Sequence, residues 1–411
     1  MLDVLDTLRE RGFVAQVSDE AGLRAALSRG SVTVYCGYDP TASSLHMGHL
    51  VSLMMLAHLQ RAGHRPIVVV GGGTGMIGDP TDRIEMRRLL SLEDIRANMD
   101  GMLPQFGRLL DFNGGPVPAL MVNNGDWLLP LGYVKFLRDI GRHFSVNQML
   151  QHSTYRQRVE SVGLNFIEFN YVLLQAYDFL QLYREYGCRL QIGGEDQWFN
   201  ILAGAELIRR IEGGEAYALV SPLLMTAGGQ KMGKTARGAV WLDPARTSPY
   251  EYYQYWINTA DADVERFLGL FTFLPMERVR ELGRLQEAEA RDAKEVLADE
   301  ATALTHGEEA AKEAQRASRA LFGGEGEAEG APTTTIQAAR LAEGVRLAAL
   351  LVDTGLAPSV TAAARLIDQG GVSVNGERVG SPGARIDEGH LRDGAVLLRA
   401  GKKRFHRIVV E

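Results

Sequence analysis

Short apolar runs alternate with longer helical patterns through the first half of the chain, and this alternation constrains the fold more than any other feature. The runs that favour strands are residues 32–37, 66–70, 118–123, 189–193 and 219–226. Between the first two lies HMGHLVSLMMLAHLQRAG, whose apolar periodicity is typical of a helix. Strands that alternate with helices predict an α/β fold with a parallel, doubly wound, Rossmann-like sheet covered by helices on both faces.

The remaining segments predict how this sheet is embedded in the chain. We expect one α/β domain over residues 1–226, with a helical insertion at 127–188, because that gap is too long for one crossover helix. Residues 227–322 predict a loop followed by an α-helical domain. Residues 323–343 are small, acidic and poor in apolar side chains, which favours a flexible linker. Residues 344–411 predict a small α+β module, helical over 346–370, with a hairpin that turns at Asn375-Gly376.

Charge divides the chain into two parts of opposite sign. The total is −7, yet residues 344–411 hold ten Lys and Arg against seven Asp and Glu, a net of +3. The other residues therefore carry −10. A basic module attached to an acidic body indicates a nucleic-acid contact at the C-terminal end of the chain.

Other sequence features bear on the cellular location of the protein and on whether it binds a membrane or a cofactor. No apolar run approaches the roughly 18 residues of a membrane span, and the start, MLDVLDTLRERGF, carries acids where a signal peptide carries bases. We therefore expect a cytoplasmic protein without a membrane partner. Cys36 and Cys188 form neither a metal-ligand spacing nor a disulfide framework, which fits a reducing cytoplasm. No protein-bound metal or organic cofactor is expected.

Two glycine motifs match well-known nucleotide sites but lack their context. Gly73, Gly75 and Gly78 fit GxGxxG, yet the next strand lies roughly 40 residues away and ends in Asn123-Asn124, not in the acid of a nicotinamide site. GGQKMGKT fits GxxxxGK[ST], but ARGAVWLDP follows it in place of the helix that a phosphate loop requires. Both matches are therefore interpreted as glycine turns that serve another ligand.

Two further clusters together carry a stronger signal. His46-Met47-Gly48-His49 begins the first helix, whose free amides and dipole favour phosphate, and Gly48 leaves room for a flat base. Residues 231–235, KMGKT, place two lysines and a hydroxyl on a glycine-flanked loop that could close over a triphosphate. Alone, the first could be surface histidines and the second an ordinary basic loop. Both together, after the first and fifth strands, predict nucleotide chemistry.

The pair resembles the HIGH and KMSKS signatures of class I aminoacyl-tRNA synthetases, with Met47 in place of Ile and Gly233 and Thr235 in place of two serines. YCGYDPTASSLHMGHL, GGGTGMIGDPT, YVLLQAYDFLQLY and LQIGGEDQWFNI resemble, more closely, the tyrosyl-tRNA synthetase family. LIDQGGVSVNGERV resembles the small RNA-binding module that ends its bacterial members. The resemblance covers nearly the whole chain.

The resemblance implies a role for each matching residue. Tyr35 and Asp178 would hydrogen-bond the tyrosine phenol, and a helix would present Tyr171, Gln175 and Asp178 on one face. The tyrosine site would comprise Tyr35, Asp79, Tyr171, Gln175, Asp178 and Gln197; the ATP site Cys36, Asp39, Gly48, Asp196, Met232 and Lys234; and the catalytic groups Thr41, His46, His49, Lys231, Lys234 and Thr235.

The reaction implied is activation of tyrosine by ATP, which brings Mg²⁺, followed by transfer to the 3′ end of tRNA. Members of the family form homodimers through the insertion, so a homodimer is implied as well. Three alternatives stay open from sequence: a tryptophanyl-tRNA synthetase, another nucleotidyltransferase with an HxGH motif, and a non-catalytic RNA-binding protein that kept the fold.

Overall fold

The computed structural model describes residues 3–80, 90–161, 163–235, 238–286, 289–323, 332–392, 394–401 and 404–411, without the side chains of 153–154, 234–235 and 321–323. The chain divides into two compact units. The first comprises Met1–Thr247 and Ile257–His306, and the second comprises Ser248–Trp256 and Gly307–Glu411.

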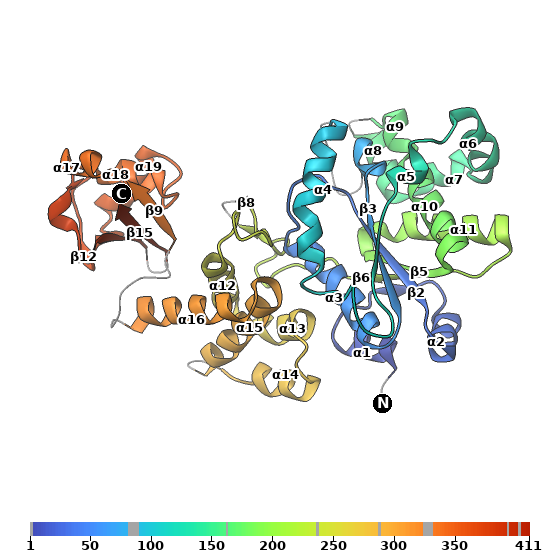
Figure 1. Cartoon of the computed structure of the whole chain (residues 1–411), viewed down its shortest axis with the longest axis horizontal. Helices are drawn as coiled ribbons and strands as arrows, with labels where there is room; N and C mark the ends of the chain where they lie inside the picture. Colours follow the sequence, from blue (N-terminus) through green and yellow to red (C-terminus); the bar gives the residue numbers. More distant parts are fainter. Residues whose placement is uncertain are drawn as a thin grey trace. The chain divides into compact units, whose positions relative to one another are not determined.

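A six-stranded sheet forms the centre of the first unit (Figure 1). Its strands lie in the order β1-β6-β5-β2-β3-β4, and all neighbours are parallel except β1, which pairs antiparallel with β6. The bounds are β1 Gln16–Val17, β2 Thr33–Tyr38, β3 Arg65–Val70, β4 Leu120–Asn123, β5 Cys188–Gly194 and β6 Tyr217–Ser221. The five predicted strands and their parallel pairing are confirmed. The antiparallel edge strand β1 was not predicted, because two residues are too few to give a pattern.

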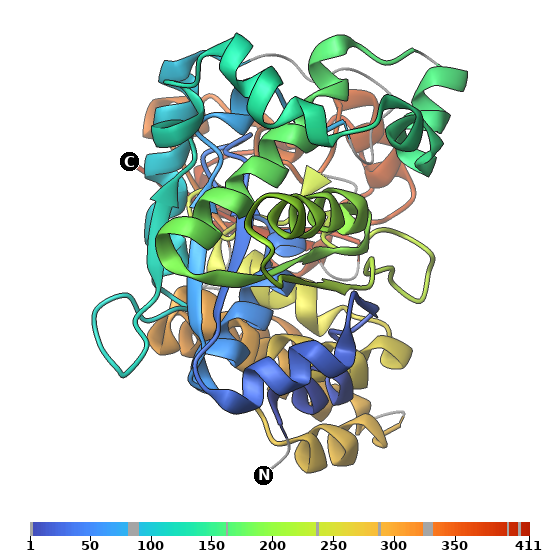
Figure 2. The same ribbon diagram turned by 90° about the vertical axis from the view of Figure 1, so that its right-hand side faces the viewer.

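The strand order reverses between β2 and β5, and this reversal determines where a ligand can bind. The chain runs outward from β2 to β3 and β4, then returns to start β5 on the other side of β2. The helices that connect these strands therefore cover opposite faces of the sheet (Figure 1). Helix α3 (Met47–Arg61) covers one face, and α10 (Tyr171–Tyr186) and α11 (Trp198–Glu212) cover the other. Helices α10 and α11 lie side by side in Figure 2 as well. In such sheets the crevice at the carboxyl ends of the two central strands accepts ligands.

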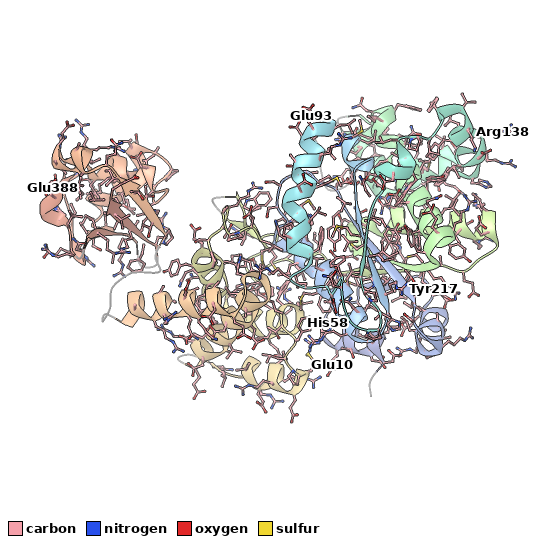
Figure 3. All side chains as sticks on the ribbon, viewed as in Figure 1. Glu10, His58, Glu93, Arg138, Tyr217 and Glu388 are labelled. Carbon is pink, nitrogen blue, oxygen red and sulfur yellow. The ribbon has the colours of Figure 1, made fainter. Side chains whose placement is uncertain are left out.

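The predicted helical insertion lies between β4 and β5. It contains α5 Gly125–Leu128, α6 Tyr133–Asp139, α7 Val146–Gln151, α8 Ser153–Glu160 and α9 Phe166–Phe169, and it leads into α10. The exposed Arg138 of α6 and Glu93 of α4 (Leu92–Phe106) lie at the periphery in Figure 3. The N-terminal helices α1 Val4–Glu10 and α2 Glu20–Arg29 precede the sheet.

Helices dominate the segment after the sheet, as the sequence predicts. They are α12 Pro249–Ile257, α13 Asp261–Phe271, α14 Met276–Gly283, α15 Ala290–His306 and α16 Glu308–Gly323. Within the first unit, the buried Arg11 guanidinium donates to the carbonyl oxygens of Gly269 and Thr272 at 3.0 and 2.9 Å. These hydrogen bonds fasten the end of α13 to the N-terminal part of the same unit.

The second unit contains a five-stranded sheet of order β12-β11-β14-β15-β9. Its strands are β9 Thr333–Ile336, β11 Val372–Val374, β12 Glu377–Arg378, β14 Ala395–Ala400 and β15 Arg404–Val410, and a two-stranded pair joins β10 Val345–Arg346 to β13 Arg385–Ile386. The helices α17 Ala338–Ala342, α18 Leu347–Asp353 and α19 Val360–Asp368 accompany them. Asn375 and Gly376 turn between β11 and β12 with φ of 49° and 86°, so the hairpin prediction is confirmed.

Two predictions for this part of the chain need correction. The linker expected over 323–343 is too long, because β9 and α17 lie within it, and β9 pairs with β15 from the far end of the sequence. Residues 324–331 lie outside the described part. The single helical stretch expected at 346–370 is two helices, which end and begin on either side of Gly355 and Pro358.

Candidate active site

A cavity of about 340 Å³ opens at the carboxyl ends of β2 and β5, where the strand order reverses. It brings together nearly all the residues singled out from the sequence, although they are spread between positions 35 and 232 of the chain. Those that line it are Tyr35, Cys36, Asp39, Thr41, His46, Gly48, His49, Asp79, Tyr171, Gln175, Asp178, Asp196, Gln197, Lys231 and Met232. The side chains of Lys234 and Thr235 lie outside the described residues.

Asp178 forms the floor of this cavity. It lies on α10 and is only 3% exposed, so this acid is buried and does not face the solvent. Its two carboxylate oxygens accept hydrogen bonds from Asn124 Nδ2 at 2.9 Å and Trp127 Nε1 at 2.7 Å. Burial raises the pKa of Asp178 to about 7, because the loss of water costs the carboxylate more than these two donors return.

Tyr35 supplies a second polar group at the same depth. The residue is 1% exposed and its ring contacts Phe179 edge-on, with centroids 5.2 Å apart. Among the described residues, no atom hydrogen-bonds its hydroxyl. Burial, and then the negative charge of Asp178, hold the pKa of Tyr35 well above its usual value, so the phenol stays protonated. A buried hydroxyl without a partner is costly, and a polar ligand atom would satisfy it.

A chain of hydrogen bonds connects this floor to the strand ends. Asn124 also donates to Thr74 Oγ1 at 2.9 Å, and Thr74 donates to Asp39 Oδ1 at 2.6 Å. The Tyr171 hydroxyl donates to Asp39 Oδ2 at 2.8 Å. Asp39, which the resemblance assigns to the ATP site, is thus bonded to Tyr171, which it assigns to the tyrosine site.

The sequence reasoning missed Asn124, Trp127 and Thr74, although all three bond to residues that it named. Asn124 did carry a signal, because it follows β4 directly at the carboxyl edge of the sheet. Trp127 and Thr74 carried none, since their partners lie 51 and 35 positions away.

A second group of polar side chains lies on the β5 side of the cavity. Gln197 donates to Asp79 Oδ2 at 2.7 Å, and Asn200 donates to Gln175 Oε1 at 3.1 Å and to Gln197 Oε1 at 3.3 Å. Asp79 is 8% exposed. A carboxylate held by amides at this depth provides an acceptor for a cationic group of a ligand.

The HMGH segment caps helix α3 with its own histidines. His46 is the N-cap, its Nδ1 accepts from Gly48 N at 3.1 Å, and His49 Nδ1 accepts from His46 N at 3.2 Å. Since both Nδ1 atoms act as acceptors, the neutral rings carry their protons on Nε2. The two rings stack with centroids 3.8 Å apart. Among the described residues, no group of three or more His, Cys, Asp or Glu could hold a metal ion.

The KMGKT loop joins the HMGH segment through the backbone. Gly233 O accepts from Val240 N at 2.9 Å, and Val240 O accepts from Met47 N at 3.0 Å. After the loop the chain forms the short hairpin β7 Lys234–Thr235 and β8 Gly238–Ala239, so the expectation that no phosphate-loop helix follows is confirmed.

Cys36 and Asp196 line the part of the cavity between β2 and β5. Burial raises the pKa of the Cys36 thiol to about 11, so the group stays neutral. Cys36 and Cys188 are both buried and free of disulfide bonds.

None of the described helices is long and apolar enough to cross a membrane.

The family model "tRNA synthetases class I (W and Y)" matches residues 27–323, and the model of the S4 domain matches 345–391. A tyrosine–tRNA ligase from Desulfatibacillum aliphaticivorans is 52% identical over all of this chain and 99% of its own, and one from Caldanaerobacter subterraneus is 51% identical over the whole of both.

Solved structures agree with these matches. A truncated mitochondrial tyrosyl-tRNA synthetase from Aspergillus nidulans superposes with a TM-score of 0.72 at 30% identity, covering 78% of this chain and 95% of that one. A tryptophanyl-tRNA synthetase from Encephalitozoon cuniculi shares the fold alone, with a TM-score of 0.54 at 13% identity and coverage of 75% and 87%. The chain therefore belongs to the tyrosine–tRNA ligase family of class I aminoacyl-tRNA synthetases and carries a C-terminal S4 domain.

Proposed function

We propose that the chain activates tyrosine with ATP, releases pyrophosphate, and transfers the tyrosyl group to the 3′ end of tRNA. The observation that carries this function is the single cavity in which Tyr35 and Asp178 lie at the floor and His46 and Lys231 at the rim. The full-length relatives at about 50% identity are tyrosine–tRNA ligases, and the tryptophanyl alternative has only a likeness of fold.

The floor of the cavity fits a phenol. The substrate hydroxyl would donate to Asp178 and accept from Tyr35, which satisfies both buried groups at once. The tyrosine ammonium would lie near Asp79 and Tyr171, with Gln175 and Gln197 beside it. Phenylalanine would leave the carboxylate and the Tyr35 hydroxyl unsatisfied, so the same groups that bind tyrosine reject phenylalanine.

The rim fits a nucleotide whose phosphates approach the start of α3. An oxygen of the tyrosine carboxylate attacks the α-phosphorus of ATP, the bond to the bridging oxygen breaks, and pyrophosphate leaves. The Nε2–H groups of His46 and His49, with Thr41, would stabilise the departing pyrophosphate. Lys231, Lys234 and Thr235 would close over it, and the Mg²⁺ that accompanies ATP supplies further charge neutralisation.

The remaining predicted residues would hold the adenosine. Gly48 leaves the first turn of α3 open to a flat base, and Met232 would lie against it. Asp39, Asp196 and Cys36 would lie beside the ribose. The 3′-terminal hydroxyl of tRNA then attacks the tyrosyl carbonyl carbon, and AMP leaves.

Pyrophosphate exchange tests this assignment of substrate. We expect ATP–pyrophosphate exchange that depends on tyrosine and is at least about 100-fold weaker with phenylalanine or tryptophan at equal concentration, because each leaves one or both floor groups unsatisfied. If tryptophan supports exchange better than tyrosine does, the assignment of tyrosine as the substrate is wrong. Binding of tRNA without exchange for any amino acid would support the non-catalytic alternative.

The tRNA would be held by the helical segment 227–322 and the S4 domain, whose part of the chain carries a net charge of +3. We expect deletion of residues 344–411 to lower kcat/KM for tRNA charging at least tenfold and to leave tyrosine-dependent exchange within twofold of the full chain. Charging is measured at limiting tRNA and physiological salt. Equal rates for the full chain and the chain without residues 344–411 would show that the S4 domain does not contribute to tRNA binding.

We further propose a cytoplasmic homodimer, since the full-length relatives at about 50% identity are bacterial and the insertion exposes many large apolar side chains. Those side chains are Leu129, Tyr133, Val134, Leu137, Val146, Leu150, Val159 and Phe166, and Val134 is 77% exposed. Clustered exposed apolar surface marks protein interfaces. A sedimentation coefficient for the monomer at micromolar concentration would contradict the dimer.

A further inference from the structure

Trp241 lies against the catalytic signature although no sequence motif marks it. It follows the KMGKT loop and forms an antiparallel bridge with His46. On either side of this bridge, Met47 N donates to Val240 O at 3.0 Å and Leu242 N donates to Leu45 O at 2.9 Å. The backbone therefore sets Trp241 directly opposite His46.

The side chains continue this contact. The His46 ring stacks on His49 with centroids 3.8 Å apart, and the Trp241 ring meets His46 edge-on with centroids 6.0 Å apart and planes at 65°. Edge-to-face contacts between aromatic rings are attractive and depend on orientation. His46 is thus held between a stacked ring and a perpendicular ring.

Trp241 is itself fixed by the turn that follows. The Arg246 guanidinium carbon lies 3.4 Å from the centroid of the Trp241 ring, and Trp241 N donates to Thr247 Oγ1 at 3.0 Å. Asp243 closes this turn, because its carbonyl accepts from Arg246 N and Thr247 N, both at 3.0 Å. Tryptophan is the aromatic ring that attracts a cation best, so the Arg246 guanidinium restrains rotation of the indole.

We propose that Trp241 is a positioning residue for His46, clamped by Arg246 so that the imidazole keeps one orientation toward the departing pyrophosphate. This assignment rests on the proposed function. His46 bonds through Nδ1 within its own segment, so the direction of Nε2–H depends on the plane of the ring. A ring that tilts by 20° no longer aims its donor at the developing charge, and preorganised donors lose much of their effect when misdirected.

A double-mutant cycle tests the proposal. In single-turnover adenylate formation, we expect Trp241→Ala to slow the chemical step about tenfold, Trp241→Phe about twofold, and neither to change tyrosine Kd by more than twofold. In a His46→Ala background, Trp241→Ala should slow the step no further, because it acts through the missing imidazole. Losses that multiply in the double variant would overturn the proposal.

Two arginine variants complete the test. Arg246→Gln removes the clamp and should slow the chemical step two- to fivefold. Arg189→Gln is its matched control, because Arg189 lies over the Tyr217 ring at 5.7 Å, away from the cavity, and should leave the rate unchanged. Equal effects of the two arginine variants would show a general loss of stability. Wild-type exchange that does not depend on tyrosine would overturn the proposed function and, with it, this role of Trp241.

Discussion

Replacement of Asp178 with alanine is expected to weaken tyrosine binding about 100-fold or more. The substrate phenol would lose its charged acceptor, and the Trp127 and Asn124 donors that now reach Asp178 would lose theirs. A hydrogen bond to a charged group contributes roughly 1.5–3 kcal/mol, and a buried donor left unpaired costs about 1–3 kcal/mol more. Equilibrium dialysis with labelled tyrosine, in the absence of ATP, measures the change directly.

The matched control is Glu185→Ala, which removes an exposed acid from the same helix. It should leave tyrosine Kd within twofold of the wild type. A folded Asp178→Ala variant, with a cooperative melt, that binds tyrosine as tightly as wild type would show that the phenol is recognised elsewhere.

The pH dependence of tyrosine binding gives an independent measure of the same group. Because burial raises the pKa of Asp178 to about 7 in the free protein, the carboxylate acceptor is present above pH 7 and is lost as the pH falls. The substrate ammonium and carboxylate stay charged between pH 5.5 and 7. Tyrosine affinity should therefore fall roughly tenfold from pH 7 to 5.5 in the wild type. The Asp178→Ala variant should show no such slope.

The contribution of Asp178 to folding stability changes with pH in the opposite direction to tyrosine affinity. The folded-state pKa of this acid lies above its usual value, so Asp178 contributes most to stability when it is protonated, and that contribution falls as the pH rises toward 7. A negative charge is thus retained at the cavity floor at neutral pH although it destabilises the folded chain. Such a cost is common where a site must accept a hydrogen bond from its substrate.

The sheet was predictable because its pattern is local. Buried parallel strands give continuous apolar runs such as VTVYCG and PIVVV, and these set β2 and β3 to within a residue or two. The two-residue β1 and the four-residue β9 give no such run, and each is defined by a partner far away in sequence. Such strands are determined by tertiary pairing, which local patterns do not carry.

The cavity was predictable only through resemblance. Spacing alone placed Tyr171, Gln175 and Asp178 on one helix face, and the structure puts all three in the cavity wall. Neither spacing nor resemblance indicated that Asn124 and Trp127 hold the Asp178 carboxylate. Those contacts depend on how β4 and α5 pack against α10. Because the paired residues lie more than 50 positions apart, no local sequence pattern indicates them.

A large effect is also expected from substitution of Gly233, where the KMGKT loop meets the HMGH segment. This residue has φ +77°, and a Cβ added there would lie 2.7 Å from Cβ of Met47. Met47 is fully buried, so it has no room to move aside. A β-branched residue at Gly233 would therefore displace the KMGKT loop from the HMGH segment, and the lysines would no longer reach the phosphates.

Gly229 in the same loop provides a matched control. It has φ +74°, and nothing lies within 4 Å of an added Cβ. Valine at either position costs roughly 1–2 kcal/mol in backbone strain. Only valine at Gly233 adds the overpacking against Met47, at about 1–3 kcal/mol.

Gly233→Val is therefore expected to slow adenylate formation about 100-fold, and Gly229→Val at most tenfold, with tyrosine Kd unchanged in both. Rapid-quench measurement of the single turnover separates this step from tyrosine binding and from tRNA transfer. Equal rates for the two variants would mean that the contact between Gly233 and Met47 does not position the loop. A slower Gly233→Val with weakened tyrosine binding would mean that the damage extends to the cavity floor. Loss confined to the chemical step would instead show that a buried methionine of the first signature sets the position of the second.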